Sequence, residues 1–379
     1  MQYVYAYKQC QRSNHELAYQ YVREAYAPDL NSMEVQDRDQ LAADKKATIG
    51  LLDLHFAQKP MESSDQKQLK VAQEAITRYE SQCSKDQIFL LNQMVDTTER
   101  VSDHYLLFLL MMIEMADESH REQNKKSNLG VRTDAPPVDT AQTNFYLNRV
   151  VQALRDKASL HHTAKANKLN WNKYRVEIRQ WYRNLIKPDE QFQAYQAQQK
   201  PELQDDIQIA RYIFNSLVLK SDPISNVFEE ADINWTENNK AIRSMVNKTL
   251  KSVQEDGDTE IVDLTPNWED DREFLTDLYK ITIKNDKEYE QIIRNKTKNW
   301  TVERIASLDS IIIKMAIAEM THFSSIPIKV TINEYIDLSK NYSTEKSKQF
   351  VNGMLDVIAQ HLQQDNRIKK SGRGLIDNQ

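Results

Sequence analysis

The sequence predicts an all-α protein, and three observations carry this prediction. Only 6 glycines and 9 prolines occur among 379 residues, so few positions interrupt a helix. Leucine, isoleucine, lysine, glutamate, glutamine and alanine are common throughout the chain. Apolar residues recur at helical spacing from residue 87 to 115 and again after residue 268, whereas the alternation typical of strands is scarce. We therefore expect helices joined by short turns.

The N-terminal half reads as a series of helices. Residues 1–30 predict a tyrosine-rich helix, and apolar periodicity at residues 71–79 and 87–115 predicts a long helical pair. The clearest linker lies near residues 119–143, which are polar and contain a Pro-Pro pair. We assign the whole of residues 31–255 to an inserted or extended helical region.

Residues 165–187 interleave basic and aromatic side chains. The members are Lys165, Lys168, Lys173, Arg175, Arg179, Arg183 and Lys187, with Trp171, Tyr174, Trp181 and Tyr182. Such a mixture could stack on nucleobases while neutralising phosphates. The alternative, which we favour, is an ordinary amphipathic helix whose rings face the core and whose basic groups face water.

Asn-Trp dipeptides at residues 234, 267 and 299 have a spacing that resembles a repeat. The helices between the copies do not resemble one another, however. Each copy leads into threonine or acidic residues, as a capped helix start does. We interpret the three copies as helix starts.

Residues 266–364 predict a C-terminal helical bundle. Residues 308–320 are apolar almost all round, as expected of a central helix. The segment from Thr331 to Glu334 fits a capping box at the start of the next helix. The inward face of that helix is predicted to comprise Ile332, Ile336 and Ser339. The basic residues 365–379 are predicted to form a flexible tail.

Composition restricts the classes of function. The formal net charge of −6 excludes nucleic-acid binding by bulk positive charge, so any such site must be a local patch or need a basic partner. Two cysteines without CxxC spacing indicate a reducing compartment, hence the cytoplasm. The longest apolar run, residues 105–113, is half the length that a bilayer span requires, and we expect neither a signal sequence nor membrane association.

No catalytic constellation is visible in the sequence. The glycines form neither GxGxxG nor GxxxxGK, so the standard cradles for dinucleotides and nucleoside triphosphates are missing. The 8 histidines are scattered, and the Asp117/His120 pair lacks the second unit and the further glutamates of a di-metal bundle. We therefore expect no enzyme, no catalytic residue, no cofactor and no metal site.

Three C-terminal segments resemble the NusB family of bacterial transcription antitermination factors. They are "LDSIIIKMAIAEM", "IPIKVTINEYIDLSK" and "KSKQFVNGMLD", in the family's order. The resemblance covers residues 268–362, about a quarter of the chain, with a weaker similarity of "MQYVYAYKQ" to the family's first helix. It implies NusB-like helical bundles with a large helical insertion in the N-terminal half.

The resemblance also implies a function and partners. NusB proteins are not enzymes; they bind the boxA element of nascent ribosomal RNA transcripts. They do so with NusE, a small-subunit ribosomal protein, in an RNA polymerase antitermination complex. The resemblance therefore makes RNA and NusE the expected partners.

Particular residues inherit expected roles from the resemblance. The RNA-binding set comprises Tyr5, Ser343, Lys346, Ser347, Lys348 and Phe350, for the last of which a plain core position is the alternative. Residues 343–348 would form a loop. Asn333 and Glu334, in the family's "INE", would make buried polar contacts, and Asn352 with Gly353, in "FVNG", would permit close helix packing.

Two departures from the family affect these expectations. The chain is much longer than a common family member and resembles a long form of Bacteroidetes-type bacteria. An arginine-rich stretch that precedes the family's first helix has no counterpart before Met1, so we expect either an earlier natural start or a relocated RNA contact. Two alternatives stay open: the NusB-like domain of a ribosomal RNA cytosine methyltransferase system, or an interaction protein without RNA binding.

Overall fold

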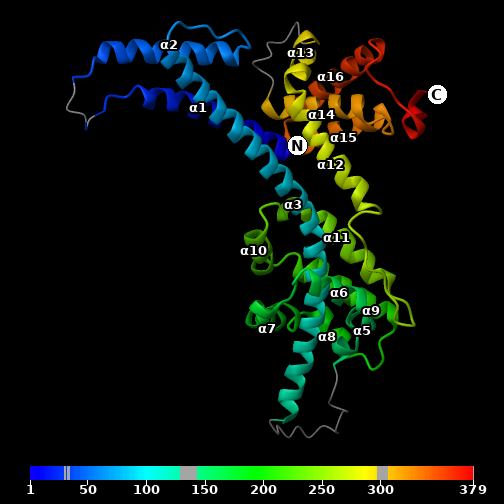
Figure 1. Ribbon diagram of the computed structural model, residues 1–379. Coiled ribbons are helices and arrows are strands. Elements are labelled where there is room, and N and C mark those ends of the chain that lie inside the picture. Colours follow the sequence, from blue (N-terminus) through cyan, green and yellow to red (C-terminus); the bar gives the residue numbers. More distant parts are fainter. Residues whose placement is uncertain (30, 32–34, 129–142, 297–305, 379) are drawn as a thin grey trace. The chain divides into compact units, whose positions relative to one another are not determined.

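The computed structural model describes residues 1–29, 31, 35–128, 143–296 and 306–378. No strand occurs among these described residues, and the all-α prediction is confirmed. The chain forms two compact units, each described by itself below (Figure 1). Unit 1 comprises Met1–Val95 with Glu269–Gln379, and unit 2 comprises Asp96–Trp268.

The N-terminal part of unit 1 consists of α1 (Gln2–Ala25), α2 (Arg38–Phe56) and the first portion of α3 (Gln66–Asn128). Helix α2 begins where the Asp37 side chain accepts hydrogen bonds from two backbone N–H groups, which satisfies donors that a helix start leaves free. Val22, Leu52 and Ala72, one from each helix, are fully buried in the small core that joins the three helices.

The predicted helical pair is wrong, because α3 is one continuous helix of 63 residues. Its sequence contains neither glycine nor proline, so nothing in it stops a helix. The polar stretch near Ser84 interrupts the apolar pattern without interrupting the backbone. The boundary between the two units, at Val95/Asp96, falls within this helix.

The C-terminal part of unit 1 is a bundle. Its helices are α12 (Trp268–Lys284), α13 (Asp286–Lys296), α14 (Ser307–His322), α15 (Ile328–Tyr342) and α16 (Glu345–Gln364). Helix α14 contacts α13, α15 and α16. Eleven of its residues are buried, on all sides of the helix. The prediction of a central helix at residues 308–320 is therefore confirmed.

The predicted capping box at Thr331 is wrong, because α15 begins one turn earlier, directly after Pro327. A proline can lead into a helix without sacrificing an N–H group, since the first N–H groups have no partner within the helix. Thr331, Tyr335 and Ser339 form the buried face, and the Tyr335 hydroxyl donates to the buried Glu319 carboxylate at 3.0 Å. Of the predicted inward residues, Ser339 is buried, whereas Ile332 and Ile336 are half-buried.

The segment after α16 lies against the bundle. Lys370 Nζ donates to the Phe323 carbonyl oxygen at 2.9 Å, and the Ser371 backbone N–H donates to the Ser324 carbonyl at 3.0 Å. A short 3-10 helix, η5 (Gly372–Asn378), follows. Hydrogen bonds to the carbonyl groups directly after α14 thus hold this segment against the bundle. A flexible tail would lack such contacts.

Unit 2 packs short helices around the second portion of α3. Its elements are α4 (Asn144–Leu147), α5 (Arg149–Asp156), α6 (Ala158–Ala166), η1 (Asn172–Tyr174), α7 (Arg175–Trp181), η2 (Tyr182–Ile186), α8 (Glu190–Gln196), α9 (Leu203–Tyr212), η3 (Ile213–Val218), α10 (Asp222–Ala231) and α11 (Trp235–Ser252). Phe108 of α3 stacks on Phe228 and Trp235, with ring centroids 4.4 and 5.7 Å away. Segments η2 and η3 are π-helical turns.

Trp235 and Trp268 are the first residues of α11 and α12, so two of the three spaced Asn-Trp copies at residues 234, 267 and 299 begin helices as predicted. The third copy lies outside the described residues. So does most of the predicted linker, and its described part, residues 119–128, is the helical end of α3. The division at residues 31–255, 266–364 and 365–379 stays a prediction.

Candidate nucleic-acid interface

The predicted RNA-binding loop at residues 343–348 is the first turn of α16. Ser343 ends α15, and the Thr344 hydroxyl accepts from the Ser347 backbone N–H at 3.2 Å, which caps α16. The Ser347 hydroxyl lies 3.0 Å from that of Thr344, and Ser347 is buried. Ser347 therefore helps to begin a helix, whereas Lys346 is exposed.

Helix α16 presents a strip of residues spaced four, three and four apart, which places them on one face. We call it the α16 strip: Lys346, Phe350, Gly353 and Val357. Lys346 and Gly353 are exposed, Val357 is 48% exposed, and Phe350 is half-buried against the bundle core. The strip thus combines a cation, a half-buried aromatic ring and a bare stretch of helix backbone.

Close packing at Gly353 was predicted, and the prediction is wrong within this chain. A Cβ atom at Gly353 would meet no atom within 4 Å. Asn352 is exposed as well. Asn333 and Glu334 are also exposed, so the buried polar contacts expected of these two residues are not made. The polar contact that joins α15 to its neighbour comes instead from Tyr335.

Tyr5 occupies a different part of unit 1 from the α16 strip. It is 37% exposed and lines a cavity of about 700 Å³ between α1, α13 and α14. Basic and polar lining residues include Lys8, Arg12, His15, Ser307, Ser310 and Lys314. No residue of the α16 strip lines this cavity, so the structure does not bring the two predicted portions of the RNA site together.

A cluster of charges forms the floor of this cavity. Asp286 binds Lys8 at 2.5 Å and Lys314 at 2.8 Å, and Lys314 also binds Glu290 at 3.3 Å. Burial lowers the pKa of Lys8, an effect that Asp286 opposes. Burial alone would raise the pKa of Asp286, but the two lysines hold it below its ordinary value. These lysines therefore tie α1 to the bundle. Sequence reasoning missed the cluster because Lys8 lies 278 residues before its partner Asp286.

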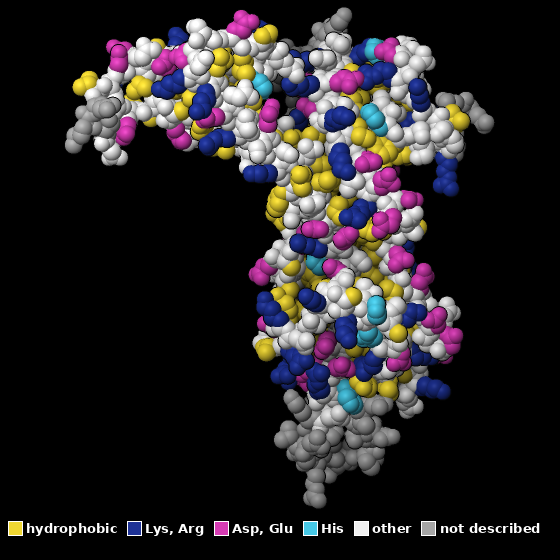
Figure 2. Space-filling model, in the orientation of Figure 1, with side chains coloured by type: hydrophobic (Ala, Val, Ile, Leu, Met, Phe, Trp, Pro, Cys, Tyr) yellow, Lys and Arg dark blue, Asp and Glu magenta, His cyan; other side chains and the backbone are white. Residues whose placement is uncertain are grey.

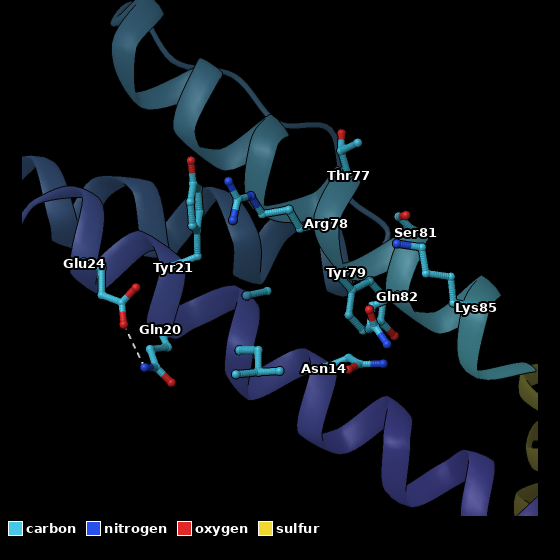
Figure 3. Close-up of a pocket in the computed structure, with 12 residues that line it drawn as sticks. Asn14, Gln20, Tyr21, Glu24, Thr77, Arg78, Tyr79, Ser81, Gln82 and Lys85 are labelled. Carbon is cyan, nitrogen blue, oxygen red and sulfur yellow. Dashed lines mark hydrogen bonds between the residues drawn. The ribbon is translucent and has the colours of Figure 1, made fainter. Parts of the chain in front are cut away.

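A second cavity of unit 1, of about 540 Å³, lies between α1 and α3 (Figure 3). The Arg78 guanidinium sits over the Tyr21 ring, 4.2 Å from its centroid, and the Tyr21 hydroxyl donates to Glu74 at 2.6 Å. Among the residues described, no group of His, Cys, Asp or Glu is placed to hold a metal ion. The polar groups of this cavity contact one another and stabilise the pairing of α1 with α3.

The basic–aromatic segment of unit 2 has the amphipathic arrangement that we favoured. Trp171, Trp181 and Tyr182 are buried in the core, so they do not offer faces for bases to stack on. Three of its seven cations are paired with two carboxylates of α3. The pairs are Arg179–Glu118 at 3.1 Å, Lys187–Glu122 at 2.6 Å, and Arg183–Glu122.

No broad positive surface is visible on the face of the molecule that Figure 2 shows. On the face shown in Figure 2, Lys and Arg side chains alternate with Asp and Glu. No described helix is both long and apolar enough to cross a membrane. A nucleic-acid contact must therefore be local, as the net charge indicated.

Comparison with known proteins connects this geometry to one family. Residues 238–360 match the model of the NusB family. The transcription antitermination protein NusB of Salinibacter ruber is 39% identical over 141 residues, which cover 35% of this chain and 88% of that protein. The chain belongs to the NusB family.

Two further relatives carry the same name. NusB of Chloroherpeton thalassium is 38% identical over 106 residues, 28% of this chain and 50% of the relative. NusB of Acetivibrio thermocellus is 42% identical over 90 residues, 24% of this chain and 62% of the relative. The chain thus spans only half to two thirds of these two proteins. No solved structure matches the chain.

The family match extends further toward the N-terminus than the resemblance predicted. It begins at residue 238, inside α11 of unit 2, and continues through α16. Within this NusB segment, the α16 strip places an exposed lysine, a half-buried aromatic ring and an exposed glycine on one face of a helix.

Proposed function

We propose that this NusB-family protein is a transcription antitermination factor, not an enzyme. It would bind boxA-type RNA of nascent ribosomal RNA transcripts together with NusE, in the cytoplasm and as part of an RNA polymerase antitermination complex. The names of its relatives support the general role. The observation that carries the RNA contact is the α16 strip.

Three members of the strip suit a contact with RNA. The Lys346 ammonium is exposed and can neutralise a phosphate. The exposed part of the Phe350 ring can stack on an unpaired base, since every base has a π-face. Gly353 lacks a side chain where no described residue lies within 4 Å, so a ligand or a partner can lie directly on the helix backbone.

The acidic character of the chain explains why a basic partner is needed. With a net charge of −6, phosphate contacts depend on a few local cations. Lys346 and Lys348 supply two of them, and NusE would supply others. Tyr5, in its separate cavity, would contact RNA only if the RNA extends from the strip to α1.

Binding of a boxA RNA and a scrambled RNA, with and without NusE, tests this proposal. We expect Lys346→Ala with Lys348→Ala to weaken RNA binding and to lower its salt slope by up to about two units, with the fold unchanged. The control is Lys284→Ala with Lys287→Ala, which removes the same charge from exposed positions of unit 1. Equal binding of boxA and scrambled RNA, with NusE present, would show an interaction protein without specific RNA recognition.

A further inference from the structure

Unit 2 contains a face from which acidic residues are missing. Residues 207–221 and 238–254 contain no Asp or Glu, in a chain with 56 acidic residues among 379. The first run includes most of α9 and all of η3, and the second most of α11, which packs on α9. Their cations are Arg211, Lys220, Lys240, Arg243, Lys248 and Lys251. Positive charge is therefore concentrated in these two runs, whereas the rest of the chain mixes both signs of charge.

Two arginines of this face are held by amide groups. Arg211 Nε donates to Asn247 Oδ1 at 3.1 Å, and Arg243 Nε donates to Asn215 Oδ1 at 2.9 Å. The two asparagines bind each other through two hydrogen bonds of 2.9 and 3.0 Å. We call this set, with the neighbouring lysines, the amide–arginine face. Its amide pair fixes both guanidinium groups at the Nε atom.

This arrangement leaves two positive charges uncompensated. An amide oxygen is neutral, so it orients a guanidinium group without cancelling its charge. In the part of the chain that the structure describes, no ion pair involves Arg211 or Arg243, and no acceptor is recorded for their Nη atoms. Arg149 provides the contrast, because Asp206 and Glu255 both bind it. The free Nη groups form the fork that recognises a phosphate through two parallel hydrogen bonds.

Exposed lysines extend the face along α11. Lys240, Lys248 and Lys251 are exposed, and none is in an ion pair with a described residue. With Arg243, Ser244 and Asn247 they line a shallow cavity of about 340 Å³. From Lys240 to Lys251 the helix rises about 16 Å, so the face can follow a chain of phosphates and not only a single ion.

The backbone beneath the amide pair is unusual. Asn215 belongs to η3, a π-helical turn, and donates to the Arg211 carbonyl oxygen at 2.7 Å. Single π-turns inside helices occur frequently at functional sites, since they displace a side chain from its regular position. Here the turn carries the asparagine that holds Arg243 and Asn247.

We propose that the amide–arginine face binds the phosphodiester backbone of RNA without regard to sequence. Its cations and forked donors suit phosphates, and no aromatic residue lines the cavity to read bases. The identification of the ligand as RNA rests on the proposed function. The inference that the face binds phosphate groups does not rest on it. The face would hold a stretch of transcript that the α16 strip does not contact.

The test uses the full chain and a fluorescent oligouridylate, which lacks boxA. In Lys240→Gln/Lys248→Gln/Lys251→Gln, we expect affinity to fall about tenfold or more and the salt slope to fall by about two units, at about 0.7 per phosphate for a single strand. Arg243→Lys keeps the charge but loses the fork, so it should weaken binding severalfold. Circular dichroism melting verifies that both variants fold.

The matched control is Lys165→Gln/Lys173→Gln/Arg175→Gln, which removes three exposed charges from another surface of unit 2. An unchanged affinity of the α11 triple variant overturns the proposal, as does an equal loss in the control. Loss of binding to phosphatidylserine vesicles with RNA binding intact overturns it too, since the phosphates would be those of lipid. Failure of the proposed function alone has a different result. In that case boxA and scrambled RNA bind equally well, but the α11 triple variant still binds oligouridylate more weakly than the wild type.

Discussion

Unit 2 carries two basic surfaces that look alike in sequence. They differ in whether carboxylates neutralise their positive charges. At the first, Arg179, Arg183 and Lys187 lie against Glu118 and Glu122 of α3. At the second, the amide–arginine face, neutral asparagine oxygens occupy the place of the carboxylates. The first surface therefore uses its charge within the fold, whereas the second keeps its charge for another molecule.

Losing a cation should have a different consequence at each surface. It should lower stability at the first surface and binding at the second. A buried carboxylate that loses its counter-ion destabilises the fold, because its charge is left without compensation in a poorly solvated site. An exposed lysine without a partner contributes little to stability. Substitutions at the two surfaces should therefore have opposite profiles.

The largest effect is expected from Arg183→Gln with Lys187→Gln. These residues are the recorded partners of Glu122, whose side chain is 10% exposed. We expect the free energy of unfolding to fall by about 2 kcal/mol, less than for a fully buried pair because both cations are partly exposed. Urea denaturation measures the change. Affinity for oligouridylate should stay the same, and a parallel loss of binding would mean that the first surface also contacts RNA.

The pH dependence of stability sharpens this result. Burial alone would raise the pKa of Glu122, but Lys187 and Arg183 hold it below its ordinary value of 4.5. A folded-state pKa below the unfolded one stabilises the protein above pH 4.5, and this stability is lost as the pH falls through the folded-state value. The difference in melting temperature between the wild type and the double variant should therefore shrink below about pH 4.5. A difference that is constant with pH would contradict this role of Glu122.

Much of the helical fold could be predicted from the sequence, because helical spacing and the shortage of glycine are local properties. The central helix α14 and the starts at Trp235 and Trp268 are examples. The continuity of α3 was missed since a polar stretch resembles a turn when its packing partners are unknown. The partners themselves are distant: Arg183 meets a glutamate 61 residues earlier. The local pattern of residues 165–187 does not predict that pairing.

The two surfaces could have been told apart only in part. The acid-free runs around α9 and α11 are visible in the sequence, but the hydrogen bonds that orient Arg211 and Arg243 are not. Glycines show the same limit. Gly374 lies where a Cβ atom would collide with the Ser324 carbonyl oxygen, whereas Gly353, the position singled out for close packing, has open space.

Gly353→Ala extends the comparison to the α16 strip, with a smaller expected effect. Alanine is favoured over glycine inside a helix by about 1 kcal/mol, and the added Cβ atom would touch nothing. We therefore expect this variant to be more stable by up to about 1 kcal/mol in urea denaturation. If RNA or NusE lies directly on this backbone, the same methyl group should weaken boxA binding in the presence of NusE.

Gly50→Ala in α2 is the matched control, because a Cβ atom there also meets nothing within 4 Å. It should gain similar stability without a change in binding. A Gly353→Ala protein that is stabilised and binds as before would show that no molecule approaches α16 at this point. One that is destabilised would contradict the open space at Gly353. A gain in stability together with a loss of binding would show that the fold does not need the bare backbone at Gly353, whereas a partner does. We propose the same relation for the cations of the amide–arginine face.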